Sequence, residues 1–187
     1  LLALATTPEP VALVEGENLK DADADHNSAE RFSRITVLGQ SSPTPTASGR
    51  TTNGARGDAT DPSVSRHRPL ILQATGQSTA ADCQRQALWE MANRNGKALA
   101  VRATVPGWRQ TPNGKLWDIN QLVHIRAPHL YVDEPLIISS IDYTLERSGG
   151  TVTHEASLTL VRPAALRPEP QPTPPPKPTQ TPTAPRR

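Results

Sequence analysis

The side chains that could do chemistry in this sequence are scattered, and one acidic group stands out by its spacing. Asp21, Asp23 and Asp25 alternate along the segment DADAD, as ligands do at the start of a calcium-binding loop. Such a loop has Gly at its sixth position and Glu at its twelfth, where this chain has His26 and Phe32. We therefore interpret this segment as a solvated polar turn, and we predict no metal site and no cofactor.

The sequence pattern contains no recognisable catalytic constellation. It lacks GxSxG, and Ser139 and Ser140 lie within a predicted strand, where hydroxyls usually bond the backbone. The single cysteine, Cys83, lies in a predicted helix and is expected to be a buried thiol. The histidines show no HxxxH spacing: His26, His67, His124, His129 and His154. A glycosidase needs two carboxylates close together in a cleft, and acidic residues on the solvent-exposed face of strands cannot be distinguished from such a pair by sequence. The candidates are Asp118, Asp133, Glu134, Asp142, Glu146 and Glu155. We predict that the protein is not an enzyme and has no catalytic residues.

Two tryptophans flank a turn in the segment VPGWRQTPNGKLWDIN. Pro112-Asn113-Gly114 predicts the turn, because Gly tolerates a positive φ angle, and the turn would bring Trp108 back near Trp117. If the two rings are exposed, they could stack on sugars or bases. If they are packed against the protein, they would close the end of a sheet. The large apolar area of tryptophan favours packing. We therefore predict that these side chains are structural hairpin residues.

The elements that would position these residues alternate between strand and helix in the first half of the chain. The segments 11–20 and 31–40 are predicted to pair as antiparallel strands, and 67–77 is predicted to be a short buried strand. The candidate core residues of these strands are Phe32, Ile35, Val37, Leu38, Leu70, Ile71 and Leu72. Thr79 and Asp82 form the pattern of a capping box at the start of a helix that Gly96 would end at the C′ position. The apolar face of this helix is Ala80, Cys83, Ala87, Leu88 and Met91.

The second half of the chain alternates apolar and polar residues with period 2, which predicts antiparallel strands with one wet face. The positions expected to face the core are Leu99, Val101, Ala103 and Val105, then Trp117, Ile119, Val123 and Ile125, then Ile137, Ile141, Tyr143 and Leu145, then Val152, Ala156, Leu158 and Leu160. The segment RSGGT at 147–151 predicts a tight hairpin turn. We therefore expect an α+β fold, mainly antiparallel β, with small barrel-like domains and one well-capped helix.

Three segments are too polar or too rich in proline to form a core. Residues 1–10 are expected to be a disordered start, 41–65 a long flexible loop, and 167–187 a Pro-rich disordered tail. The folded region would then be 11–166. The loop contains Arg56-Gly57-Asp58, the tripeptide of integrin adhesion, which we interpret as a coincidence in an accessible segment.

Composition excludes two classes of partner. The formal net charge is +2 without a block of basic residues, so no nucleic-acid specificity is expected. No apolar run approaches the length of a membrane span. The chain starts with Leu rather than Met and LLALATTPEP does not read as a signal peptide, so we expect a chain that begins inside a larger protein.

Residues 11–166 resemble the C-terminal half of the tail baseplate hub protein of Mu-like phages, a family related to the late control protein D group. The most specific segments are GWRQTPNGKLWDIN, PLIISSIDYTLE and GGTVTHEASLTLVRP. The resemblance implies a structural subunit of the baseplate central hub of a contractile tail, a homotrimer that joins the tail tube to the membrane-piercing spike. It also implies a location in the virion tail baseplate, with assembly in the host cytoplasm. The alternatives are a tail-associated cell-wall hydrolase or a carbohydrate- or receptor-binding module.

Overall fold

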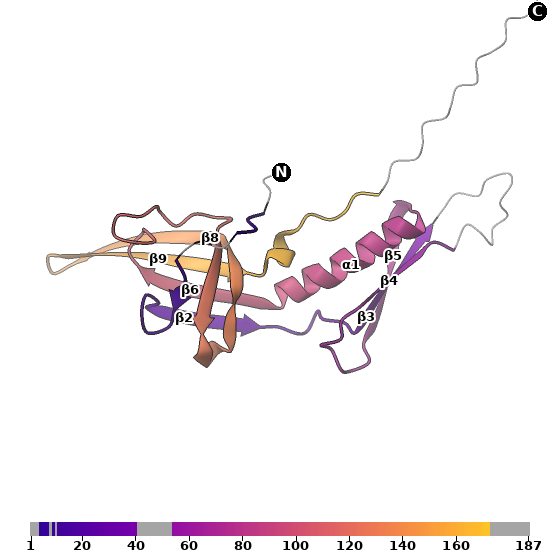
Figure 1. The fold of residues 1–187 in the computed structure, drawn as a ribbon, viewed down its shortest axis with the longest axis horizontal. Coiled ribbons are helices and arrows are strands. Elements are labelled where there is room, and N and C mark those ends of the chain that lie inside the picture. The colour runs from indigo at the N-terminus through magenta and orange to yellow at the C-terminus, as the bar shows by residue number, and fades with distance from the viewer. Residues whose placement is uncertain (1–3, 8, 10, 41–53, 173–187) are drawn as a thin grey trace, which may run out of the picture.

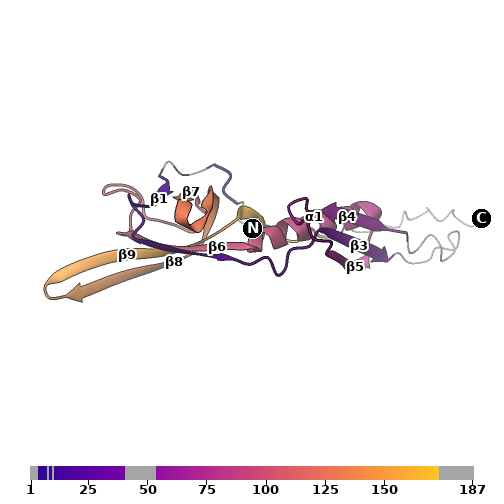
Figure 2. The same ribbon diagram turned by 90° about the horizontal axis from the view of Figure 1, so that it is seen from below.

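The chain folds into two units that lie at opposite ends of an elongated molecule (Figures 1 and 2). The computed structural model describes residues 4–7, 9, 11–40 and 54–172. Within these residues it contains a six-stranded sheet, a three-stranded sheet and one long helix. The predicted α+β class, mainly antiparallel and barrel-like with one capped helix, is confirmed.

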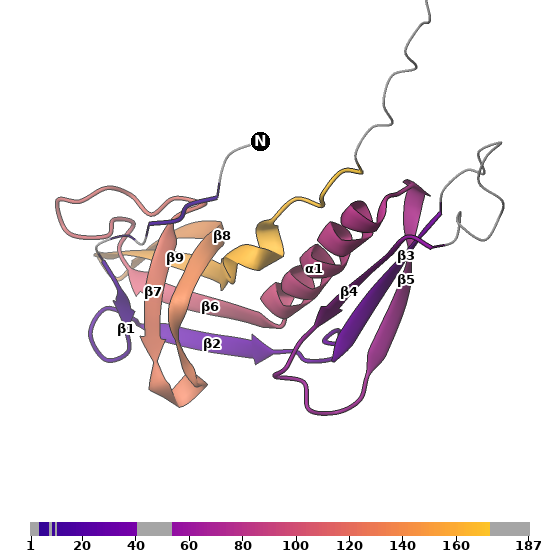
Figure 3. The same cartoon turned by 45° about the vertical axis from the view of Figure 1, so that its right-hand side comes forward.

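The larger unit is a six-stranded sheet that curls around its own core, and we call it the half barrel (Figure 3). Its strand order is β1-β7-β8-β9-β6-β2, and all neighbours are antiparallel except β1 and β7. The strands are β1 (Leu13–Val14), β2 (Asp21–His26), β6 (Leu99–Pro106), β7 (Leu122–Ala127), β8 (Val132–Ser148) and β9 (Thr151–Val161).

Strict alternation of apolar and polar residues explains most of the half-barrel core. The four predicted core positions of β6 and the predicted positions 156, 158 and 160 of β9 are all buried. Val123 and Ile125 of β7 are buried as predicted, whereas Ile119 precedes the strand and is exposed. Because side chains of adjacent strands point to the same side at paired positions, these residues form one continuous apolar face.

A β-bulge in β8 explains why a single period-2 pattern could not describe this strand. The register against β9 shifts between Ile138 and Ser140, so one extra residue changes the phase of alternation. Before the bulge, Leu136 and Ile138 join the core; after it, Ile141 and Tyr143 lie on the same face. Ile137, the odd position predicted before the bulge, is fully buried as expected, but it does not belong to the half-barrel cluster that Leu136 and Ile138 join.

The smaller unit is a three-stranded sheet with a helix on one face, and we call it the helix–sheet unit (Figure 1). The strand order is β4-β3-β5, with β3 antiparallel to β4 and parallel to β5. Its elements are β3 (Arg34–Gln40), β4 (Arg56–Thr60), β5 (Pro69–Gln77) and α1 (Ala80–Lys97). The core between sheet and helix consists of Ile35, Val37, Ala59, Ala74, Cys83 and Ala87.

The helix begins as the sequence predicts but ends differently. Thr79 and Asp82 form the reciprocal capping box, which satisfies two backbone donors of the first turn. Gly96 lies inside the helix rather than at C′, and Ala98 is the C-cap. A Cβ atom at Gly96 would lie 2.4 Å from the backbone nitrogen of Ala165, so this glycine lets the following chain approach.

Several other predictions about the first half of the chain were wrong. Residues 21–26 form the edge strand β2 rather than a polar turn, and the alternation of Asp with Ala suits a strand with one wet face. The segments 11–20 and 31–40 do not pair, because β1 pairs with β7 and β3 lies in the other sheet. Leu38 and Ile71 point away from α1 and are exposed.

The predicted flexible loop at 41–65 contains a strand. Residues 56–60 form β4, and residues 41–53 lie outside the described residues. Two short 3₁₀ helices complete the fold, at Pro128–Leu130 between β7 and β8 and at Pro163–Leu166 after β9. Residues 167–172 form neither helix nor strand, and the rest of the predicted tail, like residues 1–3, 8 and 10, is not among the described residues.

Candidate functional site

The most prominent surface feature is a two-stranded arm formed by the distal ends of β8 and β9 (Figure 2). Beyond the part that pairs with β6 and β7, the two strands contact only each other as a ladder. Gly149 and Gly150 form the turn at its end with positive φ angles, as the sequence predicts. We call residues 142–155 the arm, and Glu155 at its base still pairs with Pro106 of β6.

The arm has one apolar and one polar face. Register pairs Tyr143 with Ala156, Leu145 with His154 and Arg147 with Val152, so these side chains share a face. This face continues the core face of the half barrel, yet Leu145 is 54% exposed and Val152 is 40% exposed. The arm therefore carries core-type residues that nothing in the described chain covers.

The tryptophan segment packs against the base of the arm. The Trp108 ring lies edge-on to Tyr143 at 5.9 Å and to His154 at 4.9 Å between ring centroids. Its Nε1 donates to the carbonyl of Thr144 at 3.1 Å. Trp117 is only 3% exposed, and its carbonyl accepts a hydrogen bond from the Tyr143 hydroxyl. The two tryptophans thus contact the same strand of the arm from the loop between β6 and β7.

The turn between the tryptophans forms where the sequence predicts it, although for a different reason. The Gly114 N–H donates to the carbonyl of Thr111 at 2.9 Å, and the Trp117 N–H donates to Trp108 at 3.1 Å. Gly114 does not have a positive φ angle. A Cβ atom there would lie 2.3 Å from Oγ1 of Thr111, so a larger residue would require the Thr111 side chain to move. Asn113 is exposed at the turn. A structural role for these residues in a barrel wall remains a prediction.

The Arg-Gly-Asp tripeptide is part of strand β4, where Asp58 is hydrogen-bonded by neighbouring side chains and Gly57 packs against α1. Asp58 accepts hydrogen bonds from Arg34, Arg56 and Thr36, and these contacts lower its pKa well below the usual range, Arg56 having the largest effect. A Cβ atom at Gly57 would lie 2.2 Å from the backbone of Cys83. The glycine is therefore required for helix packing, and the expectation of an accessible loop was wrong.

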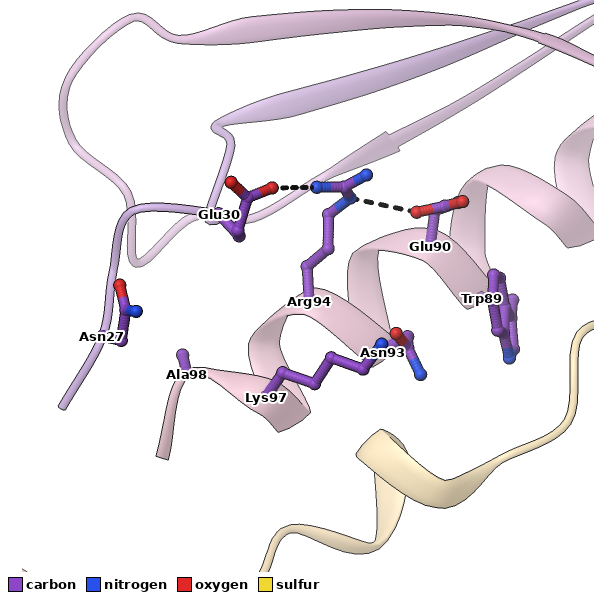
Figure 4. A pocket seen from close by; sticks show the side chains of 8 residues that line it. All are labelled: Asn27, Glu30, Trp89, Glu90, Asn93, Arg94, Lys97 and Ala98. Atoms are coloured by element: carbon purple, nitrogen blue, oxygen red, sulfur yellow. Dashed lines mark hydrogen bonds and ion pairs between the residues drawn. The ribbon is translucent and has the colours of Figure 1, made fainter. Parts of the chain in front are cut away.

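A polar pocket of about 440 Å³ lies at the joint between the two units (Figure 4). Arg94 of α1 bridges Glu30, in the segment after β2, at 2.6 Å and Glu90 of the helix at 3.0 Å. Nearby, Arg162 pairs with Glu134 at 2.7 Å and donates to the carbonyl of Asn95 at 3.2 Å. Arg162 connects the helix to the half barrel, and Arg94 connects it to the segment between β2 and β3, so the pocket is best explained as a structural joint.

We predict no metal site from the sequence. Among the described residues, no group of three or more His, Cys, Asp or Glu side chains lies close enough together to hold a metal ion. Asp21, Asp23 and Asp25 lie in a row along β2. Cys83 is fully buried, and burial raises the pKa of its thiol. Ser139 donates to the carbonyl of Thr159 at 3.0 Å, as expected of a strand hydroxyl.

The candidate carboxylates of a hydrolase are engaged with basic partners in several cases. Asp133 contacts His124 at 2.6 Å, and Glu155 pairs with Lys20. The contact with His124 lowers the pKa of Asp133. None of the described helices is long and apolar enough to cross a membrane.

Two family profiles match the chain. Residues 79–169 match the fourth domain of the Mu phage baseplate assembly protein GpP, and residues 31–88 match the third domain of NMB1110-like tail proteins. The baseplate hub protein gp44 of Escherichia phage Mu is 34% identical over 155 residues. This match covers 75% of the chain but 38% of gp44, so the chain spans well under half the length of its curated relative.

Two solved structures share the fold. The 43 kDa tail protein of prophage MuSo2 from Shewanella oneidensis matches 87% of the chain at 33% identity with a TM-score of 0.71, and the match covers 46% of that protein. The tail protein of Neisseria meningitidis MC58 matches 85% of the chain at 21% identity with a TM-score of 0.66, again over 46% of that protein. The chain is therefore a relative of the Mu-like phage tail baseplate hub proteins.

Proposed function

We propose that the chain is a structural subunit of the central hub in the baseplate of a contractile phage tail. In this proposal it forms a homotrimer that joins the tail tube to the central spike, is assembled in the host cytoplasm and ends up in the virion. The relationship to the baseplate hub protein of phage Mu supports this assignment.

The observation that carries the proposal is the uncovered apolar face of the arm. A two-stranded ribbon is marginally stable in water by itself, and exposed core-type residues mark surfaces that another chain covers. Leu145 and Val152 extend the buried face of the half barrel into solvent. A subunit of a larger assembly would bury them against a neighbour.

A structural role also agrees with the packing of the residues that the alternative functions would use. A sugar-binding platform needs two or more open aromatic faces, whereas Trp117 is buried and Trp108 is partly buried in T-shaped contacts with Tyr143 and His154. A glycosidase that cleaves cell-wall sugars needs paired acids in a cleft. Glu134 and Glu155 instead form ion pairs with Arg162 and Lys20. We propose that the protein has no enzymatic activity.

The test is deletion of the gene in the lysogen that encodes it, followed by induction and electron microscopy of the released particles. We expect tails without a spike-bearing baseplate and a loss of infectious particles, both restored by a plasmid copy of the gene. Complete, infectious tails in the deletion strain would overturn the proposal.

A further inference from the structure

The half barrel and the helix–sheet unit meet without a shared core. Among the described residues, no side chain belongs to both hydrophobic clusters. The chain passes between the two units at residues 27–33 and at Ala98, which lies between α1 and β6. These two crossings are joined where the Asn27 N–H donates to the Ala98 carbonyl at 2.9 Å. A contact at one point, beside a polar pocket of about 440 Å³, does not by itself set an angle between the units.

After β9 the chain returns to the helix and makes a third crossing. Arg162 pairs with Glu134 of β8 through two contacts, at 2.7 and 3.0 Å, and donates to Oδ1 of Asn95 in α1 at 3.0 Å. Residues 163–169 then run along the helix away from the half barrel, and we call them the strap (Figures 3 and 4). Arg162 therefore anchors the start of the strap on both units.

The strap lies on one stripe of the helix. Trp89, Asn93 and Gly96 are spaced by four and three residues, so they share a helix face. The indole Nε1 of Trp89 donates to the Arg167 carbonyl at 2.9 Å, and Nδ2 of Asn93 donates to the Ala165 carbonyl at 3.1 Å. A Cβ atom at Gly96 would lie 2.4 Å from the Ala165 nitrogen, so the glycine leaves room for the strap backbone. These three residues therefore form the contact surface for the strap.

The strap contacts the helix far from the joint, yet it is held by few interactions. Trp89 lies about 13 Å from Ala98 along the helix axis, because each residue adds about 1.5 Å. A tie at this distance restrains rotation of the helix more than the contact at Ala98 does. Both of these hydrogen bonds are accepted by main-chain carbonyls, and residues 166–169 are exposed. Because each such bond contributes little net free energy, the strap can separate while both cores stay intact.

We propose that the strap is a releasable clasp that fixes the angle between the half barrel and the helix–sheet unit. While the strap is bound to α1, the two units move as one body. When it separates, the helix–sheet unit rotates about the contact between Asn27 and Ala98, and the Arg162 contacts close to this hinge remain. This inference concerns the isolated chain and does not depend on the hub assignment.

The test measures the distance between the two units in the full chain by double electron–electron resonance. Spin labels are attached at Gln73→Cys in β5 and Arg102→Cys in β6, which are both exposed positions. Cys83 is buried and should stay unlabelled, which mass spectrometry checks. With the strap bound, we expect a single narrow distribution of distances.

Gly96→Ala should release the strap without weakening the helix. The added Cβ atom must displace the strap backbone, whereas Ala favours the helix more than Gly does. We expect the width of the distance distribution to at least roughly double, because rotation about a hinge spreads the far ends of the two units. A chain that ends at Arg162 lacks the strap and should show the same broadening. Circular dichroism of both variants should keep the wild-type helix signal.

Two matched controls keep the strap in place. Leu88→Ala changes an exposed residue beside Trp89, and a chain that ends at Pro172 retains the whole strap, so both should keep the narrow distribution. An unchanged distribution in Gly96→Ala or in the chain that ends at Arg162 would overturn the proposal, as would a distribution that is already broad in the full chain. Broadening with a loss of helix signal would also overturn it, because the strap would then stabilise the helix itself rather than act as a clasp.

Discussion

The half barrel and the helix–sheet unit fill their cores in different ways. Large aliphatic side chains from neighbouring strands fill the half barrel, among them Leu99, Leu136 and Leu158. In the helix–sheet unit, small side chains such as Ala59 and Ala87 let the helix backbone approach the strands, and Gly57 touches it directly. The first unit therefore depends on buried volume, and the second on close approach, caps and charged hydrogen bonds.

The largest effect is expected from removing volume in the half barrel. Leu158→Ala should lower the free energy of unfolding by about 2–5 kcal/mol, because Leu158 is fully buried between neighbouring strands and a cavity would remain. Urea denaturation followed by circular dichroism measures the change. Leu116→Ala, at an exposed leucine, should change stability by no more than about 0.5 kcal/mol. Equal losses in the two variants would contradict this account of the half barrel.

Adding volume should be the damaging change in the helix–sheet unit. Gly57→Ala would place a Cβ atom against the backbone of Cys83, and we expect a loss of about 1–3 kcal/mol from the displaced helix. The same denaturation assay applies, with Thr60→Ala on the same strand as the control. A stabilised Gly57→Ala variant would show that the helix does not pack closely on β4.

The helix cap is expected to contribute less. Thr79→Ala removes the side chain that accepts from the Asp82 N–H and should cost about 1 kcal/mol, whereas Thr79→Ser keeps the hydroxyl and most of the stability. Thermal unfolding of the two variants side by side measures the difference. If serine fails to rescue, the methyl group rather than the cap is what stabilises the helix.

The smallest effect is a pH dependence at Asp58. Its pKa is lowered from 3.8 in the folded protein, so the unfolded chain binds the proton first as pH falls. The stabilisation by Asp58 is therefore present above 3.8 and is lost as the pH falls below this value toward the lower folded-state pKa. Asp58→Asn should flatten the fall in stability below pH 3.8, and Arg56→Gln should flatten it less, as urea midpoints across acidic pH would show. Parallel curves for wild type and Asp58→Asn would contradict the network.

Local rules predicted the parts of the fold that local chemistry determines. The capping box at Thr79, the turn at Gly149 and the alternation in β6 follow from residue type and spacing. The bulge in β8 could not be predicted, because it depends on how β9 is paired. The strand at 56–60 was missed because its residues are small or charged, and it is held by α1 and by arginines that lie elsewhere in the sequence.

The candidate surfaces were predicted only in part. The tryptophan segment and its turn were visible in the sequence, but their contact with Tyr143 requires the fold. The strap had no sequence signal of its own, since residues 167–172 have the composition of an unfolded tail. Its contacts with Trp89 and Asn93 became evident only from the fold.

The central claim is that this chain is a self-associating structural subunit, and its mass in solution tests that claim most directly. Light scattering of the purified chain over a concentration series should show monomers converting to trimers as concentration rises. A monomer at every concentration would contradict the claim for this chain.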